Sequence, residues 1–147
     1  MKTNELISLM HAIAARIEKE KDYLTELDNV IGDGDHGINM ARGFKATETR
    51  IDGLTTPAEV LKTVGMTLVS TVGGAAGPLY GTAFMKMAQT LAGKDEITVN
   101  DLAFTLSAFS YCNLVVTHST SENTIDAMRA LYEFYKATVA YNTPAEE

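Results

Sequence analysis

The sequence has little cysteine, little positive charge and no long apolar run. Cys112 is the single cysteine, which excludes an internal disulfide, and a lone cysteine of this kind is typical of a small buried hydrophobic position. No apolar run is long enough to span a bilayer, and we find no signal peptide. These absences predict a protein of the reducing cytoplasm.

Basic residues are outnumbered by acidic ones, 12 against 19, which gives a formal net charge of −7. A surface of this sign repels the backbone of nucleic acids and the head groups of anionic membranes. We therefore expect neither nucleic acid nor membrane as a partner. A ligand that carries phosphate would need a metal ion or local hydrogen-bond donors.

Strand signals are weak along the chain, whereas apolar residues recur at helical spacing. The 147 residues can bury one core without disulfides, and no repeat, low-complexity run or linker divides them. The sequence predicts one all-α domain over residues 1–147, an antiparallel up-and-down bundle of about six helices.

Caps and periodicity give the expected bounds of these helices. Asn4 or Thr3 can cap the first, and the third opens with a capping box between Thr56 and Glu59, with Pro57 as its first residue. Apolar positions that can pack include Ile38 in the second helix and Met66 in the third. The others are expected at residues 36–49, 79–91, 98–115 and 122–140.

Residues 28–39 are the most chemically distinctive segment, and they read DNVIGDGDHGIN. Three carboxylates in one short loop repel each other unless a cation lies among them, and Mg²⁺ prefers oxygen ligands of this kind. The glycines allow the tight backbone that would bring Asp28, Asp33 and Asp35 together. The alternatives are a solvated acidic turn and simple capping of the helix that begins at His36.

Two common motifs resemble this loop but do not fit it. The glycines match the GxGxxG fingerprint of dinucleotide-binding folds, but no strand precedes them. As a calcium-binding loop that starts at Asp33, the segment has Ile38 where glycine is needed and Phe44 where a bidentate glutamate belongs.

A second candidate segment, residues 73–81, reads GGAAGPLYG and is followed by Thr82. It lacks the GK[ST] ending of a P-loop. Small residues at the start of a helix allow a phosphate to approach free N–H groups, although they also suit a simple connection between two closely packed helices. If this segment and the acidic loop meet at one end of a bundle, they can bind one metal–nucleotide complex.

These two segments carry a resemblance to a known family. LDNVIGDGDHGINMARGF and GMTLVSTVGGAAGPLYGTAF are similar to the ADP-binding L subunit of phosphoenolpyruvate-dependent dihydroxyacetone kinase and to the nucleotide domain of ATP-dependent dihydroxyacetone kinases. The match spans about residues 1–106. It implies a barrel of eight antiparallel helices with ADP or ATP at one end and two Mg²⁺ ions. It also implies metal ligands at Asp28, Asp33 and Asp35 and nucleotide contacts at His36, Gly37, Ile38, Asn39, Ala75 and Ala76.

The resemblance also implies a reaction and partners. In such a kinase, bound ADP accepts a phosphoryl group from the phosphocarrier M subunit of a phosphotransferase system, and the group passes to dihydroxyacetone on the K subunit. The chain would supply positioning and electrostatic stabilisation, with no catalytic nucleophile of its own.

The last third departs from the family pattern. Where the family has an RGK segment and then a GDKTMxD-like segment, this chain has NLVVTH and SENTIDA, and it stops at Glu147 before two further helices. Six helices would not close an eight-helix barrel. We therefore expect an open pocket, self-association that completes it, or a shortened form with little activity. The alternative function is a non-catalytic interaction or regulatory module that retains the metal loop.

Overall fold

Helices account for most of the described part of the chain, residues 1–30 and 32–105 of a computed structural model. Residues 99–105 are also helical. Within the described ranges, the only β-type pairing is an isolated bridge between Lys2 and Glu96. The predicted all-α class is confirmed. The five complete helices are α1 (Thr3–Lys19), α2 (Lys21–Asn29), α3 (His36–Ile51), α4 (Pro57–Thr71) and α5 (Ala76–Thr90).

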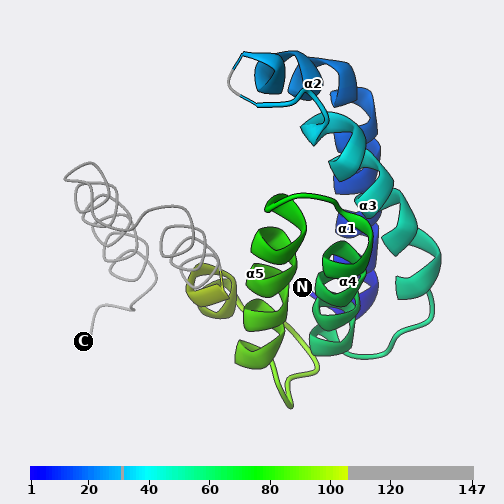
Figure 1. Cartoon of the computed structure of the whole chain (residues 1–147). Coiled ribbons are helices and arrows are strands. Elements are labelled where there is room, and N and C mark those ends of the chain that lie inside the picture. Colours follow the sequence, from blue (N-terminus) through cyan, green and yellow to red (C-terminus); the bar gives the residue numbers. More distant parts are fainter. Residues whose placement is uncertain (31, 106–147) are drawn as a thin grey trace, which may run out of the picture.

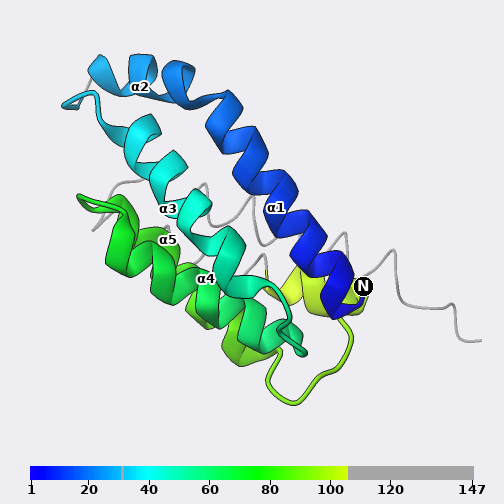
Figure 2. The ribbon, with the colours of Figure 1, turned by 90° about the vertical axis from the view of Figure 1, so that its right-hand side faces the viewer.

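Four of these helices run up and down beside one another (Figures 1 and 2). α3 packs antiparallel to α1 on one side and contacts α4 on the other, and α4 has its largest interface with α5. The short helix α2 follows α1 almost without a break and packs against α3. This arrangement places the α2–α3 loop and the α4–α5 loop at the same end of the bundle.

The core lies between these helices and follows the helical spacing of the sequence. The rings of Phe44 and Phe84 meet edge to face, with centroids 6.1 Å apart and planes at 72°, a favoured geometry for aromatic pairs. The apolar side chains buried around them include Leu6, Met10, Met40, Ile51, Val60, Leu61, Val64, Leu68, Met87 and Leu91.

Two glycines allow α4 and α5 to pack at short range. A Cβ atom built on Gly65 would lie 2.6 Å from the carbonyl oxygen of Gly81, and the reverse distance is also 2.6 Å. Real Cβ atoms do not approach oxygen so closely, because the atoms would overlap. The close contact between these helices therefore depends on the absence of both side chains.

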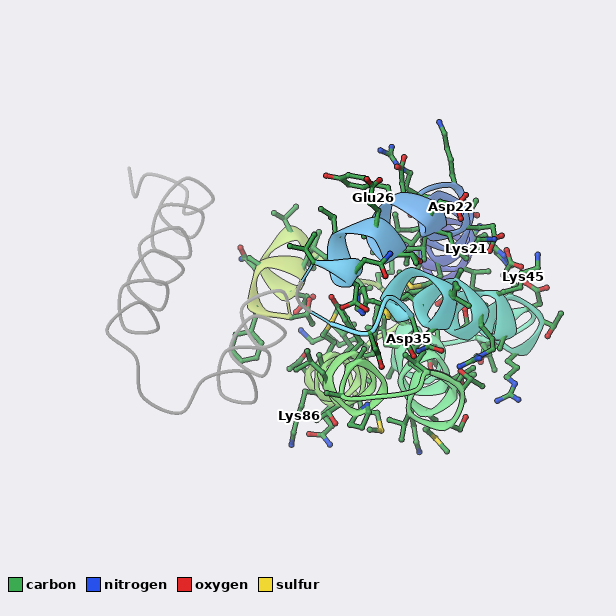
Figure 3. All side chains as sticks on the ribbon, turned by 45° about the horizontal axis from the view of Figure 1, so that its top comes forward. Lys21, Asp22, Glu26, Asp35, Lys45 and Lys86 are labelled. Atoms are coloured by element: carbon green, nitrogen blue, oxygen red, sulfur yellow. The ribbon has the colours of Figure 1, made fainter. Side chains whose placement is uncertain are left out.

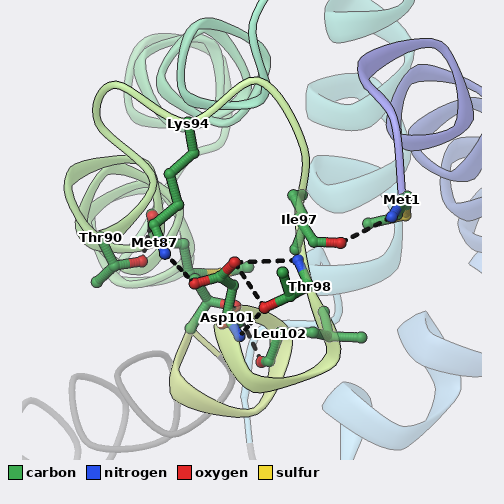
Figure 4. A network of polar contacts seen from close by, with 9 residues as sticks. Met1, Met87, Thr90, Lys94, Ile97, Thr98, Asp101 and Leu102 are labelled. Atoms are coloured by element: carbon green, nitrogen blue, oxygen red, sulfur yellow. Dashed lines mark hydrogen bonds and ion pairs between the residues drawn. The ribbon is translucent and has the colours of Figure 1, made fainter.

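The predicted caps are present at the starts of two helices. At α4, Thr56 Oγ1 accepts the Glu59 N–H at 3.3 Å, and Glu59 accepts the Thr56 N–H at 3.2 Å. Thr98 and Asp101 form the same reciprocal pair at the start of the stretch 99–105 (Figure 4). Both boundaries were predicted because the capping residues are local in sequence.

Several expectations were wrong in detail. The N-cap of α1 is Lys2 and not Thr3 or Asn4. The sequence did not predict α2, and α5 begins at Ala76, three residues before the expected start. Ile38 and Met66, which were expected to pack, are 51% and 56% exposed. Cys112, the remainder of the helix expected at 98–115 and the helix expected at 122–140 lie outside the described residues. Among the described helices, none combines the length and the apolar character required to cross a membrane.

Candidate metal and nucleotide site

Three carboxylates converge at the end of α2 and in the loop that follows it. Asp28 belongs to the last turn of α2, and Asp33 and Asp35 lie in the loop before α3. One carboxylate oxygen from each residue lies within 4.8 Å of the others. Gly34 permits this turn because its φ is +72°, a conformation that other residues rarely adopt. Oxygen ligands at this separation fit a hard divalent cation.

Asp28 also links α2 to α3. Its Oδ2 atom accepts the backbone N–H groups of Asp35 at 3.1 Å and of His36 at 3.3 Å. Asp35 occupies the N-cap position of α3, but its side chain makes no capping bond there. Asp28 therefore caps the amino end of α3 from the preceding helix, which agrees with the capping alternative that the sequence offered.

A chain of side-chain hydrogen bonds leads from Asp35 along α3 to the exposed Arg42 and the end of α4. Asn39 Nδ2 donates to Asp35 Oδ2 at 2.5 Å, and Arg42 Nη2 donates to Asn39 Oδ1 at 2.6 Å. The Nε atom of Arg42 donates to the carbonyl oxygen of Thr71 at 3.2 Å. Sequence reasoning missed Arg42, although the spacing of residues 35, 39 and 42 places all three on one face of a helix.

The acidic loop and the glycine-rich loop lie side by side. A Cβ atom built on Gly73 would be 3.4 Å from Asn39 Nδ2, and Arg42 reaches the last residue of α4, Thr71. Figure 3 shows Asp35 between the start of α3 and the loop that joins α4 to α5. The two segments that the sequence singled out therefore meet at one end of the bundle.

The start of α5 has backbone donors that no side chain caps. Ala75 is the N-cap residue and makes no side-chain capping bond, and a turn at residues 74 and 75 leads directly into the helix. Gly74 turns the chain with φ +63°. Gly77 has a second role, since a Cβ atom there would collide with the carbonyl oxygen of Val72. The segment thus combines an exposed turn at residues 73–75 with close packing at the buried Gly77.

The other residues expected to contact a nucleotide differ in their surroundings. His36 is the first residue of α3, and Ile38 in the same turn is 51% exposed. Gly37 is buried against α2, where a Cβ atom would lie 2.8 Å from the backbone nitrogen of Thr25. Asn39 is only 7% exposed. Gly37 is therefore placed to hold α2 against α3, and Asn39 to hold Asp35.

A groove of about 350 Å³ lies away from these loops, between the first turns of α4 and the last turns of α5. The acidic loop and the start of α5 are at the opposite end of both helices. The groove is therefore distinct from the predicted site. Its lining residues are Ala58, Glu59, Lys62, Met85, Ala88, Gln89 and Ala92.

Known proteins share these segments. Residues 30–147 match the family described as the DAK2 domain. The ADP-binding subunit DhaL of PEP-dependent dihydroxyacetone kinase 2 from Listeria innocua is 48% identical over 98 residues, which cover 64% of this chain and 45% of that protein.

Two further relatives are named as ADP-binding subunits DhaL. The subunit of the PTS-dependent dihydroxyacetone kinase from Lactococcus lactis is 52% identical over 77 residues, 51% of this chain and 40% of that protein. The subunit of the PEP-dependent dihydroxyacetone kinase from Escherichia coli is 45% identical over 85 residues, 56% of this chain and 40% of that protein. Each match spans less than half of the relative's length. The family match itself covers most of this chain, and the chain therefore belongs to the DAK2 domain family.

Proposed function

We propose that this chain binds ADP with Mg²⁺ between the acidic loop and the start of α5, as an ADP-binding subunit of a dihydroxyacetone kinase. The observation that carries the proposal is the position of Asn39, which bonds to the aspartate cluster on one side and lies beside the glycine-rich loop on the other. A diphosphate that reaches from the metal ligands to a helix start would need this juxtaposition.

The aspartate cluster fits Mg²⁺ in the chemistry of its donors. Asp28 and Asp35 each use Oδ2 for a hydrogen bond inside the protein, which leaves Oδ1 of each carboxylate for a cation, and Asp33 adds a third oxygen ligand. Two Mg²⁺ ions would neutralise the three carboxylates and leave positive charge for the phosphates. The loop would then attract a diphosphate that it would otherwise repel.

The nucleotide contacts that we propose lie on both sides of this cluster. The start of α5 at Ala75 and Ala76 suits a phosphate oxygen, because the positive end of the helix dipole lies there. On the other side, the first turn of α3 presents His36, Ile38 and Asn39. The exposed Ile38 side chain is then available to the nucleotide and not to the core.

In the proposed reaction, the chain positions ADP, and no side chain of the chain attacks the phosphoryl group. A phosphocarrier subunit would phosphorylate ADP, and the resulting ATP would phosphorylate dihydroxyacetone on a partner subunit. The protein's contribution is orientation and electrostatic stabilisation, the main elements of catalysis in phosphoryl transfer. The names of the relatives from Listeria, Lactococcus and Escherichia support this role.

Calorimetry with ADP tests the proposal directly. We expect ADP to bind in the presence of Mg²⁺ and not in its absence, and Asp33→Ala to abolish binding. Asp95→Ala is the matched control, because Asp95 is an exposed aspartate in the loop after α5, at the other end of the bundle. Binding of ADP without metal, or no binding at all, would contradict the proposal. Metal binding without ADP binding would favour the interaction or regulatory module instead.

A further inference from the structure

We propose that Arg42 is a positioning residue that sets the metal affinity of the acidic loop through Asn39. The inference rests on the proposed function, since it assumes that the aspartate cluster binds a divalent cation. It adds a residue that does not itself touch the metal.

The Arg42 side chain joins two elements at the end of the bundle. Its Nη2 atom donates to Asn39 Oδ1 at 2.6 Å, and its Nε atom donates to the carbonyl oxygen of Thr71 at 3.2 Å. Thr71 is the last residue of α4, two positions before Gly73. Because the guanidinium is planar and rigid, anchoring one of its nitrogens fixes the direction of the other.

These bonds determine which way the Asn39 amide faces. An asparagine amide has one accepting end and one donating end, and arginine can only donate. Oδ1 of Asn39 therefore faces Arg42, and Nδ2 faces Asp35, to which it donates at 2.5 Å. If the amide turned over, its oxygen would face the carboxylate. Asn39 is 7% exposed, so few water molecules could bond to the turned amide.

The hydrogen bond from Asn39 fixes the orientation of the Asp35 carboxylate, one of the proposed metal ligands. With Oδ2 of Asp35 held by Asn39, the second oxygen of Asp35 keeps one direction relative to Asp28 and Asp33. Groups that hold a metal ligand in this way contribute to affinity because the ligand loses less freedom on binding. The positive charge of Arg42 acts in the opposite sense, since it repels a cation. Positioning and charge thus predict effects of opposite sign.

Arg50 provides a matched control on the same helix. Its Nη1 atom donates to Thr67 Oγ1 at 3.3 Å, so that Arg50 also bridges α3 to α4. Arg50 lies eight positions after Arg42, far along α3 from the acidic loop. Loss of this bridge tests the general effect of weakening the α3–α4 contact.

The test is a Mn²⁺ titration of the full chain, followed by electron paramagnetic resonance, with Mn²⁺ as the probe because it takes the same octahedral oxygen ligands as Mg²⁺. We expect Arg42→Met to weaken Mn²⁺ binding about tenfold. Arg42→Lys retains the charge but loses the planar pair of donors, and we expect it to weaken binding by a similar factor. Arg50→Met should stay within about twofold of wild type on the same scale. Tighter binding by Arg42→Met, with Arg42→Lys like wild type, would show a charge effect and overturn the proposal.

A double-mutant cycle separates positioning from a loss of general stability. If Arg42 acts through Asn39, Asn39→Ala alone should weaken Mn²⁺ binding, and Arg42→Met should have no further effect in that background. Additive effects would overturn the inference. A wild-type chain that fails to bind Mn²⁺ would overturn the proposed function together with the inference, whereas a wild-type chain that binds, with Arg42→Met binding equally well, would overturn the inference alone.

Discussion

The carboxylate of Asp28, in the last turn of α2, accepts the backbone N–H of His36, the first residue of α3, at 3.3 Å. Two tasks thus fall on one side chain. Its Oδ2 atom accepts amide groups at the start of α3 that would otherwise be unpaired, and the carboxylate also belongs to the cluster with Asp33 and Asp35. Substitutions at this position can separate the structural task from the ligand-binding task.

Asp28→Asn and Asp28→Ala should differ in stability and agree in metal binding. Asparagine keeps an oxygen that accepts the two N–H groups, whereas alanine leaves them without a partner. We expect Asp28→Ala to lower the free energy of unfolding by about 1 kcal/mol, and Asp28→Asn by clearly less, in urea titrations followed by circular dichroism. Both variants should lose Mg²⁺-dependent ADP binding in calorimetry. If Asp28→Asn bound metal and nucleotide like wild type, Asp28 would be a cap and not a ligand.

Sequence patterns predicted the parts of this structure whose causes are local. The start of α4 depends on Thr56, Pro57 and Glu59, which are neighbours in the chain. The apolar spacing of α1 likewise indicates its buried face. The acidic loop was found for the same reason, because its three carboxylates lie within eight residues. Local signals of this kind do not depend on the rest of the fold.

Features that depend on packing between helices could not be predicted from the sequence. α2 has no fully buried residue, and its apolar side chains Tyr23 and Leu27 are 57% and 50% exposed, so that it has no clear inward stripe. Arg42 donates to the carbonyl of Thr71, 29 positions away. Because every residue has a backbone carbonyl, the sequence does not indicate which one accepts this bond. The role of Asn39 as a link between two loops likewise became visible only from the packing of α3 on α4.

The contact between α4 and α5 should be sensitive to one methyl group. Gly65→Ala places a Cβ atom 2.6 Å from the carbonyl oxygen of Gly81 and 2.8 Å from Met85 Cγ, so the helices must separate. We expect a loss of about 1–3 kcal/mol in the free energy of unfolding, measured by urea titration. This loss should exceed the gain from the higher helix propensity of alanine relative to glycine. Lys62→Ala, on the exposed side of the same helix, is the control and should change little. A more stable Gly65→Ala variant would disprove the tight contact.

Asp101 should make stability depend on acid pH. The Lys94 ammonium, together with the N–H and hydroxyl groups of Thr98, lowers the pKa of Asp101 from 3.8 to about 2 (Figure 4). A carboxyl group whose pKa is lower in the folded state stabilises the fold above its unfolded pKa, and this contribution is lost as the pH falls through the folded pKa. The stabilisation that Asp101 contributes is therefore lost as the pH falls from about 4 to about 2.

Comparison with Asp101→Asn isolates this contribution. We expect wild type to exceed the variant in free energy of unfolding by a constant amount between about pH 5 and pH 7, and the difference to shrink as the pH falls from about 4 to about 2. Urea titrations at several pH values would measure it. Asp95→Asn removes one negative charge from an exposed aspartate nearby and is the control for the loss of charge itself. A difference between wild type and Asp101→Asn that did not change over this range would contradict the ion pair with Lys94.

Gly37→Ala should damage the metal site without altering a ligand. A Cβ atom at this position would lie 2.8 Å from the backbone nitrogen of Thr25, and the added methyl group would therefore push α2 away from α3. Because α2 carries Asp28, we expect Mn²⁺ affinity to fall by about tenfold or more in the titration described for Arg42. Gly53→Ala is the matched control, since Gly53 has φ +78° and open space around it. That variant should lose stability through backbone strain and retain metal affinity, whereas equal losses of affinity in both variants would mean that destabilisation alone explains the effect.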